Sequence, residues 1–216
     1  MADQVAGAAT LRFHAGEARA SSTDPDSWLL ERSRQGDLHA FEQLFRKYQT
    51  YVYNIGLGML GNGDDASDIT QETFLRIHRN LDRFRGDAAF STWLYRVAVN
   101  LCITELRRRQ RGHAPLAEDL RTAETEEPVI AEPEAPDVAI VREEDRRRVH
   151  RALRHLPPDY RAIMVLRHFQ QLAYDEIARV LGLSLSQVKT RLFRARRMFK
   201  ERYEALTGEG DGLQTD

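Results

Sequence analysis

The chain has 216 residues, 42% of them hydrophobic, and a formal net charge of −1 at pH 7. Its one cysteine, Cys102, excludes an internal disulfide framework and a thiolate metal site, and we expect it to be a small buried thiol. No apolar run is long enough to span a membrane, and the N-terminus lacks the apolar core of a secretion signal, so we expect a cytoplasmic protein with no direct membrane insertion.

The pattern of residues 27–111 predicts a small bundle of helices. A short helix comes first, and Asp37 is placed to cap the second, which carries apolar residues at three- and four-residue spacing. The glycine-rich break at residues 61–63 ends this second helix. We expect Asp64 or Asp65 to cap the third.

The third helix is expected to have an inner apolar stripe and an outer polar side. That outer side carries Asp68, Gln71, Glu72 and Arg76, with Phe74 and Leu75 nearby. A solvated surface and a docking surface for a protein partner both fit this pattern. Periodicity alone does not decide between them.

The helix within the stretch from Phe84 to Arg109 carries two different faces. One is an ordinary core stripe, formed by Leu94, Val97, Ala98 and Leu101. The other combines an aromatic ring, cations, an amide and a hydroxyl, in Trp93, Arg96, Asn100, Thr104 and Arg107. Bases stack on an indole, amides read base edges and guanidinium groups hold phosphates, so this stripe predicts contact with nucleic acid. The preceding loop adds Phe84, Arg85 and Phe90; taken singly, Trp93 also fits a core anchor.

Charge is distributed unevenly along the chain. Residues 28–111 hold thirteen basic and ten acidic side chains, and residues 112–145 hold two basic and eleven acidic ones together with four prolines. Residues 146–203 hold fifteen basic against four acidic side chains. We therefore expect two folded modules, residues 27–111 and 146–206, that both face a polyanion and are joined by an acidic flexible linker at residues 112–145.

The second module contains LAYDEIARVLGLSLSQVKTRLFRARRMF, which fits a helix-turn-helix, and Asp159 is placed to cap the helix before it. Gly182 supplies the tight turn, and Ser184 with Gln187 has the spacing of a capping box. The core side of the last helix carries Val188, Leu192, Ala195 and Phe199, and the opposite side carries Lys189, Thr190, Phe193, Arg194 and Arg197. An aromatic ring among cations suits a thymine methyl in the major groove, whereas the alternative is an amphipathic helix with a stray phenylalanine.

Nothing in the sequence predicts an enzyme, a cofactor or a small-molecule substrate. The histidines of the second module, His150, His155 and His168, lack the carboxylate or cysteine partners of a metal site. No glycine-rich phosphate loop and no nucleophile–base pair is present, and no alternating β pattern appears. We expect an all-α fold of two helical modules, with a disordered leader at residues 1–26 and a disordered tail at residues 207–216.

The two modules together resemble bacterial sigma factors, specifically the short extracytoplasmic-function group. DASDITQETFLRIHRNLDRFRGDAAFSTWLYRVAVN is similar to the second conserved region of that family. LPPDYRAIMVLRHFQQLAYDEIARVLGLSLSQVKTRLFRAR is similar to its fourth, and the resemblance runs from about Trp28 to Ala205. It implies a promoter-specificity subunit that acts only with core RNA polymerase, in a stress or envelope response.

The resemblance also implies site residues and partners. The clamp of the polymerase β′ subunit is expected to bind Asp68, Gln71, Glu72, Phe74 and Arg76. The promoter −10 element, as an opened non-template strand, is expected to bind Phe84, Arg85, Asp87, Phe90, Thr92, Trp93, Arg96 and Asn100. The −35 element, as duplex, is expected to bind Arg167, Tyr174, Lys189, Thr190, Phe193, Arg194 and Arg197. The flap of the β subunit and an anti-sigma factor are the other implied partners, and the linker is expected to thread toward the RNA exit path.

One local departure from the family is visible. Gly-Leu-Ser-Tyr is common before the helix-turn-helix, whereas this chain has Gln171-Leu172-Ala173-Tyr174. Ala173 lacks the capping hydroxyl, which we expect to cost about 1 kcal/mol of helix stability.

Two other interpretations are open at this point. One is a regulator that binds duplex DNA alone, with the first module as a sensor, but a sensor does not need the aromatic and basic stripe. The other is a sigma mimic that only sequesters an inhibitor. A mimic could lose its DNA-binding cations, whereas this chain keeps Arg85, Arg96, Lys189 and Arg194.

Overall fold

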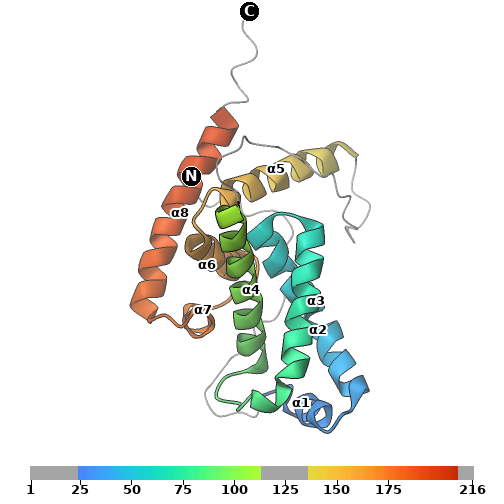
Figure 1. The fold of residues 1–216 in the computed structure, drawn as a ribbon. Helices are drawn as coiled ribbons and strands as arrows, with labels where there is room; N and C mark the ends of the chain where they lie inside the picture. Colours follow the sequence, from blue (N-terminus) through green and yellow to red (C-terminus); the bar gives the residue numbers. More distant parts are fainter. Residues whose placement is uncertain (1–23, 113–135, 209–216) are drawn as a thin grey trace, which may run out of the picture.

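A computed structural model of the chain describes residues 24–112 and 136–208. Every regular element within them is a helix, which confirms the all-α expectation (Figure 1). The elements are α1 (Ser27–Arg34), α2 (Leu38–Leu60), α3 (Gly63–Arg79), the 3-10 helix η1 (Leu81–Arg83), α4 (Phe90–Gly112), α5 (Pro136–Arg154), α6 (Pro158–His168), α7 (Tyr174–Leu181) and α8 (Leu185–Gly208). None of these helices is both long and apolar enough to cross a lipid bilayer.

Polar side chains and glycine set the helix ends in the first module. Asp37 caps α2 as predicted, because its carboxylate accepts hydrogen bonds from two free amides of the first turn. The helix ends at Gly61, whose φ of 74° is left-handed and favours glycine. The prediction for α3 was wrong: Asn62 is the cap and accepts from the amide of Asp65 at 3.1 Å. Asp64 and Asp65 lie inside the first turn, where a carboxylate complements the helix dipole.

The core of the first module is built along α2. The side chains of Leu44, Val52, Ile55 and Met59 are fully buried on its inner face. The predicted core stripe of α4 is confirmed, because Leu94, Ala98 and Leu101 are buried and Val97 is half-buried against them. Burial raises the pKa of the Cys102 thiol to about 12, so the expectation of a buried neutral cysteine is also confirmed.

The helix-turn-helix of the second module begins and turns as the sequence predicts. Gly182 ends α7 with a left-handed φ of 66°. The capping box is reciprocal: the Gln187 amide donates to Ser184 Oγ at 3.2 Å, and the Ser184 amide donates to Gln187 Oε1 at 2.8 Å. These contacts fix where the exposed helix α8 starts.

Two other caps in the second module differ from what the sequence suggests. Asp159 does not cap α6, because the helix starts at Pro158 and Pro157 holds the cap position. Ala173 caps α7 without a side-chain hydrogen bond, as expected. The other half of that capping box remains, since Glu176 Oε2 accepts from the Ala173 amide at 2.7 Å. The loss is therefore confined to the one hydrogen bond that the missing hydroxyl would accept.

Three boundaries differ from the predicted ones. The end of the predicted leader is packed, with Asp26 only 1% exposed. The helix α5 begins at Pro136, within the predicted linker, where a proline fits the first helical position because its missing amide would be unpaired there. The last helix reaches Gly208, beyond the predicted start of the tail. The remaining predictions for the leader, linker and tail concern residues 1–23, 113–135 and 209–216, which lie outside the described residues.

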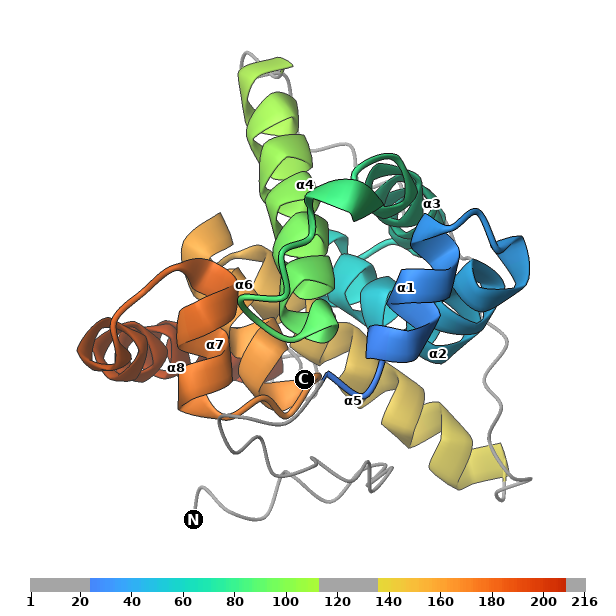
Figure 2. The ribbon, with the colours of Figure 1, turned by 90° about the horizontal axis from the view of Figure 1, so that it is seen from below.

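The two modules pack directly against each other. Helix α4 lies between α3 of the first module and α6 and α7 of the second (Figure 2). Helix α2 contacts α5 and α6 near its C-terminal end. The helices approach closely at Gly58, where an added methyl would lie 2.8 Å from Val165 Cγ2. Glycine at this position therefore lets the two helices meet.

A buried cation also joins the modules. Arg161 of α6 is 5% exposed, and its guanidinium donates to the Met59 carbonyl of α2 at 2.6 Å. It also donates to the carbonyls of Arg154 and Leu156, at the end of α5. Carbonyls at helix C-termini carry partial negative charge, which compensates a cation that burial removes from water. Burial lowers the pKa of Arg161 to about 10, which leaves the side chain charged at neutral pH.

We predict that Gly58→Ala separates the modules. The methyl would overlap Val165, while alanine favours helix α2 itself by roughly 1 kcal/mol. Small-angle X-ray scattering should show a larger radius of gyration with no loss of helical circular dichroism. Val165→Ala in the same chain removes the clashing methyl groups and should restore the smaller radius.

Gly56→Ala is the matched control. Its methyl would meet Ala66 of α3 within the first module, so it should lower the free energy of unfolding without separating the modules. An unchanged radius of gyration in Gly58→Ala would contradict the packing described here.

Candidate nucleic-acid interface

The first half of α4 and the loop before it form an aromatic cluster. Trp93 is half-buried and stacks on Phe84, with 5.2 Å between ring centroids and 22° between planes. Phe90 lies beneath both rings, at 6.0 Å from Phe84 and 6.1 Å from Trp93, and is fully buried. Phe84 and Trp93, which are half-buried, are therefore the rings of this cluster that a base can reach.

Two predicted DNA-binding residues on this segment need correction. Phe90 has no exposed surface, because α4 starts at this residue and its ring points inward against Tyr48. Thr92 is 7% exposed. Phe90 therefore supports the surface from below, and Thr92 contributes only a small part of it. Truncation of Phe90 to alanine would cost about 3–5 kcal/mol of stability through the cavity it leaves, so its loss would report on the fold.

A pocket of about 190 Å³ lies over this cluster. Its walls combine two aromatic rings, several guanidinium groups and the Asp87 carboxylate. They are formed by Arg83, Phe84, Arg85, Gly86, Asp87, Ala88, Thr92, Trp93 and Arg96. Most of these residues were predicted from sequence. Arg83 was missed, although its charge just before the loop is visible in the sequence.

Arg96 is the predicted DNA-binding residue that the second module engages. Its guanidinium donates to the Val180 carbonyl at 3.3 Å and also to the Arg179 carbonyl, both in the last turn of α7. Asn100, one turn further along α4, is exposed. In this arrangement Arg96 therefore has one side on the pocket and its hydrogen bonds on α7.

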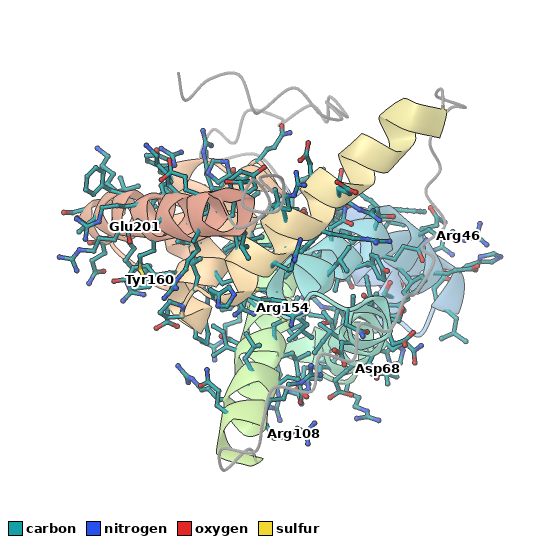
Figure 3. The ribbon with its side chains drawn as sticks, turned by 90° about the horizontal axis from the view of Figure 1, so that it is seen from above. Arg46, Asp68, Arg108, Arg154, Tyr160 and Glu201 are labelled. Carbon is teal, nitrogen blue, oxygen red and sulfur yellow. The ribbon has the colours of Figure 1, made fainter. Side chains whose placement is uncertain are left out.

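The basic end of α4 is partly structural. Arg109 pairs with Glu105 at 2.8 Å and with Asp65 of α3 at 2.7 Å, so it ties the two helices together. Arg108 also pairs with Glu105, and hydrogen bonds from the two guanidinium groups lower the pKa of that carboxyl to about 2. Figure 3 shows Arg108 near the far end of α4, with Asp68 on the neighbouring α3. Arg107 is exposed and stays available to a polyanion.

The outer face of α3 is a second candidate surface. Asp68, Gln71 and Arg76 are exposed, and half-buried Glu72 pairs with Arg76 at 2.5 Å. The prediction that Phe74 belongs to this face is wrong, because its ring is 4% exposed and packs against Phe45 at 4.7 Å. Leu75 takes its place and is 49% exposed. Leu75 lies seven residues after Asp68, which is about two helical turns, and this spacing places both residues on the same face.

A groove of about 310 Å³ adjoins this face. It runs between α2 and α3 and is lined by Phe45, Gln49, Thr50, Tyr53, Ser67, Thr70 and Gln71. Only Gln71 of this set was predicted from sequence. The residues from α2 were missed because Phe45 belongs to the apolar stripe and the polar side chains of Gln49, Thr50 and Tyr53 follow the helical period without a distinguishing motif.

The exposed side of α8 carries all five residues predicted for it. Lys189, Thr190, Phe193, Arg194 and Arg197 are exposed, and Phe193 has 69% of its surface accessible. Val188, Leu192 and Ala195 are buried on the opposite side, as expected, and Phe199 is half-buried. Arg197 also pairs with Glu201 at 3.7 Å. The helix thus presents an apolar ring among cations to solvent.

Arg167 and Tyr174, the other residues predicted for this surface, interact with each other. The Arg167 guanidinium lies 5.2 Å from the Tyr174 ring centroid and donates to the Leu172 carbonyl at 2.8 Å. That carbonyl belongs to a turn in which Gln171 has a left-handed φ of 55°. Arg167 therefore holds the turn that leads into the helix-turn-helix. Among the described residues, no group of three potential ligands is arranged around a metal position.

The family comparisons match both modules in the predicted order. Residues 44–112 match the family model described as Sigma-70 region 2. Residues 146–199 match the model described as Sigma-70, region 4.

Curated relatives match over almost their full length. The RNA polymerase sigma-H factor of Pseudomonas aeruginosa is 34% identical over 190 residues, which cover 86% of this chain and 97% of the relative. The ECF RNA polymerase sigma-E factor of Escherichia coli K12 is 36% identical over 185 residues, which cover 84% of this chain and 95% of the relative.

Solved structures share the fold. CnrH in complex with the cytosolic domain of CnrY superposes with a TM-score of 0.61 at 24% identity, over 83% of this chain and 97% of CnrH. The sigma factor RpoE of Bartonella quintana, solved with the anti-sigma factor NepR, gives a TM-score of 0.55 at 19% identity, over 76% of this chain and 96% of RpoE.

Proposed function

Because this chain belongs to the sigma-70 family of RNA polymerase sigma factors, in its extracytoplasmic-function group, we propose that it directs core polymerase to promoters through two chemically different DNA surfaces. The first module binds the −10 element as an opened non-template strand. The second module binds the −35 element as duplex. The observation that carries the proposal is the contrast between a recessed aromatic pocket on α4 and a protruding cationic face on α8.

The chemistry of the α4 pocket supports binding to an unpaired base. A base in duplex DNA is stacked and offers only its edges, whereas an extruded base offers a flat face to an aromatic ring. The Phe84–Trp93 stack presents such a ring at the floor of a pocket edged by Arg83 and Arg85. Stacking on an aromatic side chain contributes roughly 1–3 kcal/mol per base. Exposed Asn100 adds an amide that can read a base edge.

The form of α8 supports binding to closed duplex. A helix fits the major groove, and the exposed side of α8 is convex. Phe193 stands 69% exposed between Lys189 and Arg197. Its ring suits a thymine methyl, and the cations around it suit the flanking phosphates. Each good base contact in the major groove contributes about 1–3 kcal/mol of discrimination.

The remaining surfaces suit protein partners. The acidic character of Asp68 and Glu72 disfavours DNA, and exposed Leu75 on the same face favours a protein contact, for which we propose the clamp of the polymerase β′ subunit. The second module would contact the flap of the β subunit. An anti-sigma factor is a further proposed partner, since Bartonella RpoE, of similar fold, was solved with one. Release from it would place this chain in a stress or envelope response.

Charge reversal at Asp68 combined with Gln71→Ala should weaken association with core polymerase. We expect the affinity for core polymerase to fall about ten-fold or more. A partner surface that complements the Asp68 carboxylate would face a like charge after the reversal, and like charges across an interface repel. Both residues are exposed, so the free energy of unfolding should stay within roughly 0.5 kcal/mol. Titration of labelled core polymerase measures the affinity.

Glu42→Arg provides the matched control for this experiment. It makes the same charge change at an exposed position of α2, outside the α3 face. If Asp68→Arg with Gln71→Ala binds core as tightly as Glu42→Arg, the α3 face is not the docking surface.

The two DNA surfaces should fail in different ways when their key residues are removed. Asn100→Ala should leave the first, closed complex of holoenzyme and promoter intact but reduce permanganate-reactive opened DNA by about ten-fold. Arg194→Ala should instead weaken the closed complex by a similar factor. A template opened in advance at the −10 element should rescue Arg194→Ala only in part. Equal defects of the two variants on closed and pre-opened templates would contradict the division of labour.

A further inference from the structure

The loop that forms most of the pocket has little structure of its own. It runs from Phe84, which follows η1, to Ala89, which precedes α4. Gly86 within it has a left-handed φ of 78°, and no atom lies within 4 Å of where its Cβ would be. A loop that selects a base must nevertheless hold its residues in a fixed geometry. The contacts that hold its two ends therefore bear directly on recognition.

The start of the loop is held from α1. The Arg34 guanidinium donates to the Phe84 carbonyl and, at 3.4 Å, to the Leu81 carbonyl of η1. It also lies 5.9 Å from the centroid of the Phe84 ring, which is within the range of a cation–π contact. One side chain thus fixes both the backbone and the ring of Phe84, and this ring is half of the stack under the pocket.

The end of the loop is held from the residues just before α1. Asp24 Oδ2 accepts from the Phe90 amide at 2.6 Å, across 66 positions of sequence. Phe90 begins α4, the two residues before it are alanines, and the first turn contains no acidic side chain. Asp24 therefore supplies the N-terminal cap and the negative charge that the helix does not supply itself.

Asp24 is itself held in place. Its Oδ1 accepts from the Asp26 amide at 3.0 Å, and its carbonyl accepts from the Ser27 amide at 2.8 Å, where α1 starts. Asp26 is buried and accepts from Tyr48 Oη and, at 2.5 Å, from Lys47 Nζ of α2. Burial and this carboxylate raise the pKa of Tyr48, so its hydroxyl stays a donor. The contacts that Asp24 makes with the end of the loop are thereby anchored on α2, the central helix of the module.

We propose that Asp24 and Arg34 are positioning residues for −10 strand recognition. They clamp the two ends of the loop at residues 84–89 and so fix the pocket before DNA arrives. Both lie before residue 44, where the match to the second conserved region begins. The inference rests on the proposed function of the pocket, and it assigns to α1 and the three residues before it a specific part in promoter opening.

The test uses holoenzyme with Asp24→Ala, Asp24→Asn and Arg34→Ala, on duplex promoter and on a single-stranded −10 oligonucleotide. Asp24→Ala should reduce both opened DNA and oligonucleotide affinity by about five-fold, the factor that corresponds to a lost N-cap. Asp24→Asn keeps an oxygen acceptor and should recover most of that loss. Arg34→Ala should reduce both and relax the base preference at the −10 element. Core binding and the closed complex should not change.

Asp37→Ala separates positioning from stability. Asp37 caps α2 with the same kind of hydrogen bonds, so this variant should lose similar stability while it keeps normal opening. The positioning role of Asp24 is wrong if Asp37→Ala and Asp24→Ala reduce promoter opening equally. It is also wrong if Asp24→Ala opens the promoter normally while Asn100→Ala does not. If Asn100→Ala also opens normally, it is the proposed −10 contact of α4 that fails.

Discussion

Helix α4 has to satisfy three surfaces at once, and the arrangement of the whole molecule follows from this constraint. Its inner stripe, with Leu94 and Ala98, is fully buried in the first module. Its N-terminal turn, with Trp93, forms the floor of the pocket. Arg96, beside Trp93 on the outward side of α4, donates to carbonyls at the end of α7 in the second module. The 100° step between successive residues of a helix is what allows neighbours in sequence to serve core, pocket and partner module.

The contact of Arg96 with α7 gives the packed arrangement a functional consequence. Carbonyls at a helix C-terminus and a phosphate both attract a guanidinium, so in the proposed complex α7 and a DNA strand would compete for Arg96. In the proposed complex, a phosphate that accepts from Arg96 would replace its hydrogen bonds to the Arg179 and Val180 carbonyls of α7. The buried contacts at Gly58 and Arg161, between α2 and α6, hold the modules in the same arrangement. The proposed binding of DNA at the pocket would therefore be linked to the close packing of the modules through Arg96.

The sequence predicted the fold class, the helix-turn-helix and the exposed face of α8, because each depends on local signals. Gly182 ends α7 and Ser184 caps α8 through contacts with residues close in sequence. Phe193 departs visibly from the apolar stripe. The cap of α3 was not predicted, since Asn62, Asp64 and Asp65 are all suitable residues and only the path of the backbone selects among them. Burial of Phe90 against Tyr48 and the cap that Asp24 supplies to α4 both depend on contacts between residues far apart in sequence, 66 positions in the second case, and helical periodicity does not contain such contacts. Packing between the modules was not predicted for the same reason. Nothing in the sequence around Gly58 of α2 indicates that it contacts Val165 of α6.

Family membership excludes the regulator that binds duplex DNA alone, and it leaves the sigma mimic as the competing account. Run-off transcription by purified core polymerase on fragmented genomic DNA, with the 5′ ends of the transcripts mapped, separates the two most directly. We expect transcripts from a defined set of start sites only when this chain is added. These start sites should share one sequence element near −10 and another near −35. A chain that produces no start site of its own would contradict the account and favour the mimic, which only sequesters an inhibitor.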